Sequence, residues 1–264
     1  MIIASIIIVT KNQKNFLEKT IPVLKKQIQG EYETIVVDPG STDGAREYCM
    51  KNQVKVVDIS PKNFNYAHAF NIGAAQANGT YLVRLSGDCI PLREDWLSEM
   101  VKPFKDPKIG GVFGKYVLSG RKGFGYPDYW PAWRFPKKYT VYSVKPFLFM
   151  GAGLLNFSLG KNVYEFAGGC CAIRKKIWQK RPFNESLLEG EDAEYSWFLH
   201  IIGYDIVYNP KAEVVHEHRV DIRKTIKNIL GITKWNWIFN VVIWKYWLQR
   251  LKGINSYKNI VYKN

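Results

Sequence analysis

The stretch that decides the fold is the apolar run Ile3-Ala4-Ser5-Ile6-Ile7-Ile8-Val9-Thr10 near the start of the chain. The run is short, rich in β-branched residues and followed at once by Lys11-Asn12. Such a run is typical of a strand that is buried on both faces of a parallel sheet. A secretory signal peptide needs a basic start, a longer apolar segment and a small-residue cleavage site, so we expect a strand here rather than a leader.

Further strands alternate with helices through the first hundred residues. Apolar runs and turn residues predict strands at 34–38, 54–59, 81–85 and 111–118, and helices after Asn12 and at 45–51, 66–77 and 95–101. Past a Gly-rich, aromatic and basic excursion at 119–164, the pattern predicts a helix at 192–202 and short strands near 205–208 and 213–216. This alternation predicts an α/β fold with a mostly parallel, doubly wound sheet, which binds ligands at the carboxyl ends of its strands.

Composition and charge narrow the class of protein. The chain has 264 residues, 47% of them hydrophobic, which excludes wholesale disorder. Its four cysteines are too few for a disulfide scaffold and lack zinc-ligand spacing, which indicates a reducing cytosol. The 38 Lys and Arg outnumber the 23 Asp and Glu, giving a net charge of +15. This excess predicts an anionic partner: nucleic acid, a membrane surface or a phosphate-bearing substrate.

The last part of the chain differs from the rest and divides it into residues 1–220 and a tail at 221–264. From Arg219 onward the sequence carries ten Lys and Arg against one Asp, and four of its Trp residues. No apolar stretch reaches the roughly 20 residues that cross a bilayer. Apolar residues recur at helical spacing with Lys among them, so we expect an amphipathic helical tail. It either lies in a membrane interface or packs on residues 1–220 or on a second subunit, as in a homodimer.

Several common nucleotide and nucleophile motifs are missing from the sequence. There is no Gly-x-x-x-x-Gly-Lys loop, no Gly-x-Gly-x-x-Gly after the first strand and no Gly-x-Ser-x-Gly elbow. Nor is there an RNP, KH, helix-turn-helix or zinc-finger pattern, which argues against a nucleic-acid partner. The site therefore has to be sought at the strand ends.

Acidic side chains follow two of the predicted strands. Asp38 ends the strand at 34–38, just before a dense turn at 39–44, and Asp88 follows the strand at 81–85. A carboxylate placed like Asp38 can accept hydrogen bonds from a base or a ribose. One placed like Asp88 can bind a divalent metal on a diphosphate. Each is also explained as an ordinary turn or helix-capping residue.

A second acidic cluster and a pair of histidines come later in the chain. Glu191 and Asp192 open the helix at 192–202, where the helix dipole stabilises carboxylates with or without catalysis. His216 and His218 would point the same way from a strand and can ligate a metal. A partly buried pair at a strand end is the structural alternative for the two histidines.

Taken together, these pieces resemble glycosyltransferase family 2, whose members have the GT-A fold, a Rossmann-like sheet. The resemblance covers roughly residues 4–219, and its matching segments are Ser5–Asn12, Ile35–Gly44, Phe64–Gly73, Gly79–Pro91, Gly190–Asp192 and Asn209–His216. The pieces Phe-Asn-x-x-x-x-x-Asn-x-Gly at 64–73 and Leu-Ser-x-Asp-x-x-Pro at 85–91 are most similar to the rhamnosyltransferase-like branch.

The resemblance implies a role for each matching residue. The nucleotide pocket would be lined by Thr10, Asn12, Asp38, Ser41, Asn71 and Ser86. Asp88 stands for the last Asp of the family's Asp-x-Asp metal motif, and Ser86 replaces its first. His216 matches the histidine that completes the site for Mg²⁺ or Mn²⁺, with His218 in reserve. Asp192 matches the catalytic base, with Glu191 beside it.

The activity implied by the resemblance is an inverting glycosyl transfer. The donor would be a UDP-, dTDP- or GDP-sugar, and the acceptor a hydroxyl group of a lipid-linked glycan in polysaccharide or glycoconjugate biosynthesis, with no nucleic acid as partner. The basic tail then predicts a cytoplasmic protein attached peripherally to the cytoplasmic face of the membrane. Two alternatives stay open: a catalytically inactive, transferase-like interaction module and a nucleic-acid-binding protein.

Overall fold

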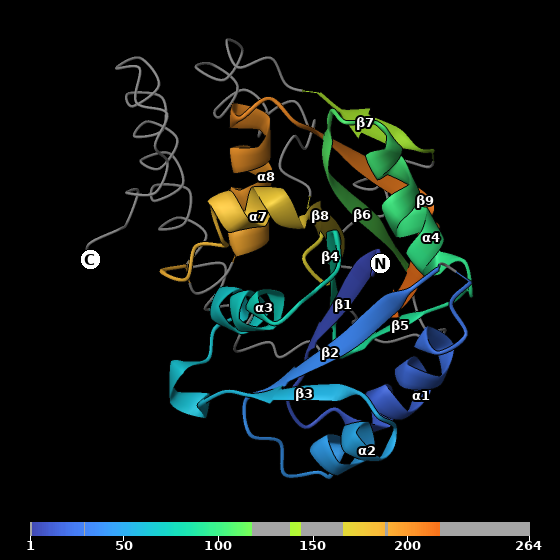
Figure 1. Ribbon diagram of the computed structural model, residues 1–264, viewed down its shortest axis with the longest axis vertical. Helices are drawn as coiled ribbons and strands as arrows, with labels where there is room; N and C mark the ends of the chain where they lie inside the picture. Colours follow the sequence, from blue (N-terminus) through green and yellow to red (C-terminus); the bar gives the residue numbers. More distant parts are fainter. Residues whose placement is uncertain (1, 29, 118–137, 144–165, 188–189, 217–264) are drawn as a thin grey trace.

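The apolar run at the start of the chain forms strand β1 (Ala4–Val9), which is buried along its whole length. The structure is a computed structural model that describes residues 2–28, 30–117, 138–143, 166–187 and 190–216 (Figure 1). Strand β1 pairs in parallel with β2 (Tyr32–Asp38) on one side and with β4 (Tyr81–Ser86) on the other. Strand β3 (Lys55–Asp58) extends this parallel half of the sheet beyond β2.

The described strands form one nine-stranded sheet in the order β3-β2-β1-β4-β8-β6-β9-β5, and β7 also pairs with β9. The remaining strands are β5 (Cys89–Pro91), β6 (Ile109–Val117), β7 (Thr140–Tyr142), β8 (Cys170–Arg174) and β9 (Asp205–His216). Strand β8 lies between β4 and β6 and is antiparallel to both. The sheet is therefore parallel in its first half, as expected, and mixed in its second.

Helices cover both faces of the sheet (Figure 1). On one face lie α1 (Lys14–Leu24), α2 (Ala45–Lys51) and α4 (Trp96–Val101). On the other lie α3 (Tyr66–Ala75), α7 (Lys175–Lys180) and α8 (Glu191–Ile201). Short 3₁₀ turns occupy Pro61–Asn63 and Lys102–Lys105. Each face buries its own apolar layer, so the strand ends at the sheet's edge are left for polar side chains.

The chain from 205 to 216 is one strand, β9, rather than the two short strands expected from its sequence. It continues through Pro210 because its partner β6 is irregular: the pairing register shifts between Phe113 and Lys115. A Cβ on Gly114 would lie 2.2 Å from the carbonyl oxygen of Ala212, so only glycine allows this close approach. The long strand carries His216 to the carboxyl edge of the sheet.

Three sequence-based expectations fall wholly or largely outside the described residues. The excursion at 119–164 is described only at 138–143, and the tail at 221–264, with its boundary at 220, is not described. His218 also lies outside the described residues. In the part of the chain that is described, no helix has the length and apolar character needed to span a bilayer.

Candidate active site

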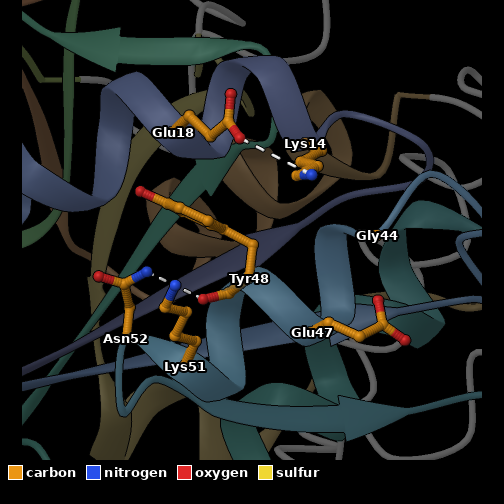
Figure 2. Close-up of a pocket in the computed structure, with 7 residues that line it drawn as sticks. All are labelled: Lys14, Glu18, Gly44, Glu47, Tyr48, Lys51 and Asn52. Atoms are coloured by element: carbon orange, nitrogen blue, oxygen red, sulfur yellow. Dashed lines mark hydrogen bonds and ion pairs between the residues drawn. The ribbon is translucent and has the colours of Figure 1, made fainter.

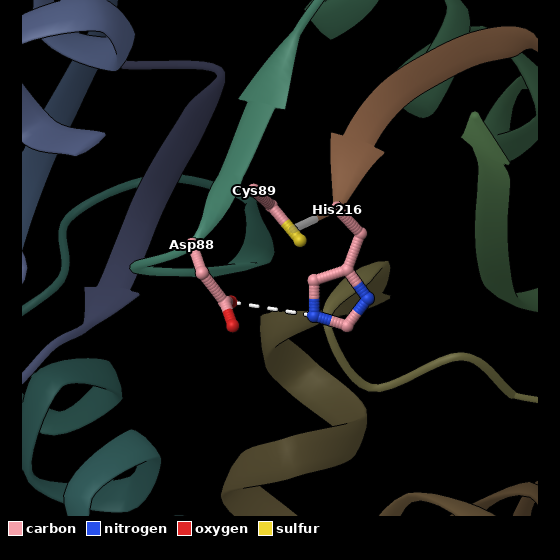
Figure 3. Close-up of side chains that lie close together, drawn as sticks. All are labelled: Asp88, Cys89 and His216. Atoms are coloured by element: carbon pink, nitrogen blue, oxygen red, sulfur yellow. Dashed lines mark ion pairs between the residues drawn. The ribbon is translucent and has the colours of Figure 1, made fainter. Parts of the chain in front are cut away.

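Asp88 and His216 meet at the carboxyl edge of the sheet. Asp88 follows β4, and β5 then pairs with the end of β9 so that Cys89 lies opposite His216. His216 Nε2 lies 3.3 Å from Asp88 Oδ1, and the two side chains are only 9% and 12% exposed (Figure 3). A carboxylate oxygen beside an imidazole nitrogen is a donor set that can hold a divalent metal ion. The two residues predicted to hold a metal are therefore brought together.

Cys89 is the third metal-ligating side chain at this point. Its Sγ lies within 4.8 Å of the Asp88 and His216 donor atoms (Figure 3). The side chain is fully buried, and this burial raises the pKa of the Cys89 thiol well above its ordinary value. Asp88, Cys89 and His216 therefore form a group of three side chains that could hold a metal, with the Cys89 thiol protonated in its absence.

Asp192 is the second residue of α8, in the turn that follows Gly190, which has the left-handed conformation (φ 77°). Its Oδ2 accepts a hydrogen bond from the Gly168 backbone N–H at 2.9 Å, and its Oδ1 accepts one from Ala193 N–H at 2.7 Å. Burial and the neighbouring Glu191 carboxylate raise the pKa of Asp192 to about 6. A carboxylate with this pKa is ionised at neutral pH and still binds a proton well, as a general base must.

Glu191 has a different environment from Asp192, although the sequence placed both together as catalytic. Its Oε1 lies 2.7 Å from Nη2 of Arg84, and the side chains are 5% and 6% exposed. The Glu191 carboxylate is thus engaged in a buried ion pair with the middle of β4. The charge of Glu191 is held by Arg84 beneath the surface, and its expected catalytic role beside Asp192 stays a prediction.

A glycine turn lies between Asp192 and the pair Asp88 and His216. A Cβ on Gly168 would lie 2.6 Å from Asp192 Oδ2, so the turn packs directly against the Asp192 carboxylate. The next residue, Gly169, donates its N–H to the Tyr116 hydroxyl at 2.9 Å, and its carbonyl accepts from Ser86 N–H at 2.9 Å. The Tyr116 ring is centred 4.8 Å from the His216 ring. The contacts run from Asp192 through this turn to His216 and Ser86.

The predicted nucleotide-binding residues after β1 and β2 hold one another in place. Asp38 is almost fully buried, and its Oδ1 accepts hydrogen bonds from the N–H and the hydroxyl of Ser41, both at 2.8 Å. The Ser41 Oγ accepts from Asn12 N–H at 2.9 Å, and Asn12 Oδ1 accepts from Thr42 N–H at 2.8 Å. Asn12 adopts a left-handed φ of 53°. Two loops that are far apart in sequence are thereby joined at the same edge of the sheet.

Thr10 lies where β1 meets the Ser86-Gly87-Asp88 segment. Its hydroxyl donates to Gln13 Oε1 at 3.0 Å, and Gly87 N–H donates to the Val9 carbonyl at 3.0 Å. A Cβ on Gly87 would lie 2.7 Å from Thr10 Cβ and 2.1 Å from Gln13 Oε1. Gly87, between Ser86 and Asp88, is therefore required for close packing on the end of β1. This packing fixes the position of Asp88.

Asn71 does not join this group of side chains, and its expected place beside the nucleotide stays a prediction. The side chain is 7% exposed, and its Nδ2 donates to the Phe183 carbonyl and to Glu185 Oε1, both at 2.9 Å. Its Oδ1 accepts from Trp178 Nε1 at 2.9 Å and from Phe183 N–H at 3.1 Å. An amide has four such positions, and all are used. Asn71 ties α3 to the segment that leads toward α8.

Comparison with known proteins identifies the family. The description "Glycosyl transferase family 2" matches residues 5–181, which is more than half of the chain. The chain belongs to glycosyl transferase family 2. A poly-beta-1,6-N-acetyl-D-glucosamine synthase of Staphylococcus epidermidis is 22% identical to it over 213 residues, which are 79% of this chain and 48% of the synthase. The chain thus spans about half the length of that relative.

Solved structures support the same fold for this family 2 transferase. Residues 1–349 of S. aureus TarS in complex with UDP-GlcNAc match with a TM-score of 0.64 at 19% identity, covering 83% of this chain and 60% of that one. The mannosyltransferase PcManGT of Pyrobaculum calidifontis, in complex with GDP-Man and Mn²⁺, matches with a TM-score of 0.58 at 18% identity, covering 81% and 56%. At these identities the likeness shows a shared architecture, and the sheet described above has the GT-A fold.

A surface groove of the transferase lies apart from these strand ends. It has a volume of about 460 Å³ between α1 and α2 and is lined by Lys14, Glu18, Gly44, Glu47, Tyr48, Lys51 and Asn52 (Figure 2). Its lysines and glutamates are mixed, and Lys14 lies 3.9 Å from Glu18. None of the predicted site residues lines it, so we do not assign the groove to the site.

Three residues that shape the site were not found from the sequence: Gln13, Arg84 and Tyr116. Arg84 carried a usable signal, since a charged residue in the middle of the buried run Leu82-Val83-Arg84-Leu85 requires a buried partner. Gln13 and Tyr116 carried none, because both act through neighbours that only the folded chain brings near.

Proposed function

We propose that this family 2 transferase moves a sugar, with inversion, from a nucleotide-sugar donor to a hydroxyl group of a glycan acceptor. The observation that carries the proposal is the pair of acidic sites joined by the Gly168–Gly169 turn: Asp192 on one side and Asp88 with His216 on the other. One site suits removal of a proton, and the other suits a cation beside a diphosphate. Such a division of charge is what a nucleotide-sugar transfer requires.

In the proposed reaction Asp192 is the general base. Its carboxylate takes the proton from the acceptor hydroxyl while that oxygen bonds to the anomeric carbon of the donor. The bond from this carbon to the diphosphate oxygen breaks, and the electron pair leaves with the nucleoside diphosphate. A single displacement inverts the anomeric configuration and needs no carboxylate nucleophile. The raised pKa of Asp192, about 6, supports this role because the carboxylate is ionised yet basic at neutral pH.

Asp88 and His216 would hold the divalent cation, Mg²⁺ or Mn²⁺. The cation would supply positive charge at the departing diphosphate. Two observations support the assignment: the 3.3 Å approach of an imidazole nitrogen to a carboxylate oxygen, and the Mn²⁺ in the structure of PcManGT. On the nucleotide side we propose Thr10, Asn12, Asp38, Ser41 and Ser86 as the lining residues, since their loops meet at the same edge.

We further propose that the acceptor is a lipid-linked glycan in polysaccharide or glycoconjugate synthesis. The polysaccharide synthase among its relatives and the basic, aromatic tail at 221–264 support this. The tail would attach the protein peripherally to the cytoplasmic face of the membrane. Flotation with anionic liposomes tests it: replacing Lys227, Lys234, Lys245 and Lys252 by Glu should abolish flotation. Unchanged flotation would reject the tail's role. The competing arrangement is a homodimer joined through the tail. Sedimentation of the wild type and of the four-lysine variant distinguishes such a dimer from membrane attachment.

The decisive experiment for the reaction is release of nucleoside diphosphate from a panel of UDP-, GDP- and dTDP-sugars with Mn²⁺ or Mg²⁺. The rhamnosyltransferase-like motifs make dTDP-linked deoxysugars the first to try. We expect release that depends on the cation and is lost in both Asp88→Ala and Asp192→Asn. If no donor is turned over and none raises the melting temperature, the catalytically inactive interaction module becomes the better interpretation. The sequence leaves this alternative open because Ser86 replaces the first acid of the metal motif.

A further inference from the structure

A buried ion pair connects the strand that leads to the cation site with the helix that carries the base. Arg84 lies in the middle of β4, two residues before Ser86, and Glu191 is the first residue of α8. Their 2.7 Å contact is 6% and 5% exposed. The Arg84 guanidinium also lies 5.9 to 6.0 Å from the ring centres of Tyr66, Phe70 and Phe183. An aromatic cage therefore surrounds a charge that water does not reach.

Such a pair is poorly explained as a stability device. Removing two charges from water costs about as much as their attraction returns, and apolar residues of similar volume often replace such pairs without loss. Here the neighbours on the same sheet face are apolar, and the site could have been filled with aliphatic side chains. Unlike two aliphatic side chains, an ion pair fixes how its two elements are oriented relative to each other. It also changes the pKa of nearby ionisable groups.

The ionisable group that this pair reaches is Asp192. The charged groups facing the Asp192 carboxylate come from α8 and β4: the Glu191 carboxylate raises its pKa, and the Arg84 guanidinium lowers it. Strand β8 contributes Cys171, whose thiol pKa burial raises well above its ordinary value, so that the thiol stays neutral. The N–H groups of Gly168 and Ala193 complete its surroundings.

We propose that Arg84 and Glu191 are a positioning pair: together they hold the first turn of α8 against β4 and set the pH at which Asp192 accepts a proton. The proposal rests on the proposed function, in which Asp192 is the base. It also separates the two neighbouring acids, since Asp192 contacts the substrate and Glu191 acts through Arg84. A change in either member of the pair reaches the reaction only through Asp192.

The chain offers a matched control one turn further along α8. Arg181 pairs with Glu194 through Nη2 and Oε1, and these side chains are 10% and 2% exposed. This is a second buried ion pair on the same helix, whereas the main charges that act on Asp192 are those of Glu191 and Arg84. Glu194→Gln therefore tests what losing a buried pair does to α8 without altering the charge beside the base.

The test uses Glu191→Gln alone and Glu191→Gln combined with Arg84→Gln. Neither variant leaves the Glu191 carboxylate buried without Arg84. Glu191→Gln keeps a hydrogen-bond acceptor for Arg84 and removes the negative charge, so the titration midpoint of Asp192 should fall by about one pH unit. Adding Arg84→Gln to Glu191→Gln then removes the positive charge, and the midpoint should rise again. Glu194→Gln should leave it at the wild-type value.

Two measurements read these midpoints in the full-length protein. Carboxyl-detected NMR of ¹³C-aspartate-labelled protein in EDTA follows Asp192 directly, with its resonance assigned by its loss in Asp192→Asn. The acidic limb of kcat for nucleoside diphosphate release, at saturating Mn²⁺ and donor, should move in the same order, with the donor KM unchanged. Arg84→Lys, which keeps the charge, should stay closest to wild type.

Equal midpoints in Glu191→Gln, the double variant and wild type would overturn the proposal, even if all of them were less active. So would an equal shift in Glu194→Gln, since that result would mean a general loosening of α8. Failure of the proposed function is a different result: Asp192→Asn would then keep its turnover, whereas the NMR titrations would still report the effect of the pair on Asp192.

Discussion

The raised pKa of Asp192 predicts a cost to the stability of the folded protein. The pKa is raised from 3.8 to about 6, so the folded chain holds this proton more tightly than the unfolded chain does. Any stabilisation from the protonated carboxyl is complete below the unfolded value and is lost as the pH rises through the folded value. Asp192→Asn removes the titration. The stability of the variant relative to wild type should therefore increase with pH.

The magnitude follows from the size of the shift. Two pKa units correspond to about 3 kcal/mol at about 1.4 kcal/mol each. We therefore expect the difference in unfolding free energy, variant minus wild type, to grow by about 2–3 kcal/mol between about pH 4 and pH 7 and then to level off. Asparagine also loses one of the two N–H contacts from Gly168 and Ala193. That loss is independent of pH and shifts the whole curve without changing its slope.

Urea unfolding, followed by tryptophan fluorescence in EDTA at half-unit pH steps, measures the difference. Asp58→Asn is the control, because the exposed Asp58 bonds to Arg46 and has a lowered pKa. Its stabilisation is present at neutral pH and is lost as the pH falls, so its difference curve should be shallow and slope the opposite way. A flat curve for Asp192→Asn would refute the reasoning, since the carboxylate would then ionise equally easily in both states.

Three further substitutions test the geometry of the site. Gly168→Ala places a Cβ 2.6 Å from Asp192 Oδ2, so kcat should fall at least tenfold while the donor KM stays near wild type in steady-state kinetics. Gly87→Ala places a Cβ 2.1 Å from Gln13 Oε1 and should weaken nucleoside diphosphate binding in calorimetry; adding Gln13→Ala should restore part of it. Asn71→Ala removes four buried hydrogen bonds and should lower the unfolding free energy by about 2–4 kcal/mol while the calorimetric affinity for the nucleotide stays unchanged.

The parallel half of the sheet could be predicted because its strands are unbroken apolar runs between turn residues. Strands β1, β2 and β4 lie close to their expected ranges. The position of β8 could not be predicted. Its sequence, Cys170-Cys171-Ala172-Ile173-Arg174, is buried on both faces and so has no alternation that indicates its neighbours or direction. Its insertion between β4 and β6 is decided by packing between residues far apart in sequence.

The candidate site, like the fold, could be predicted from the sequence only in part. The meeting of Asp88 with His216 followed from the order of the family motifs, and the structure confirms that they are close. The separate environments of Glu191 and Asp192 could not be predicted, because adjacent acids at a helix start look alike until Arg84 is placed beside one of them. For Asn71 the family motif suggested a contact with the nucleotide, and the structure adds hydrogen-bond partners from residues 178–185 that the sequence did not indicate.

The short ladder between β5 and β9 also gives the site an order of assembly. Strands β1 to β4 all precede residue 87 and can pair early as the chain leaves the ribosome, whereas His216 reaches Asp88 only after β9 has been synthesised and docked. Because closing so long a loop costs chain entropy before any contact forms, we expect this docking to be among the last folding events. Divalent cation affinity would then report that a nascent or refolding chain is complete.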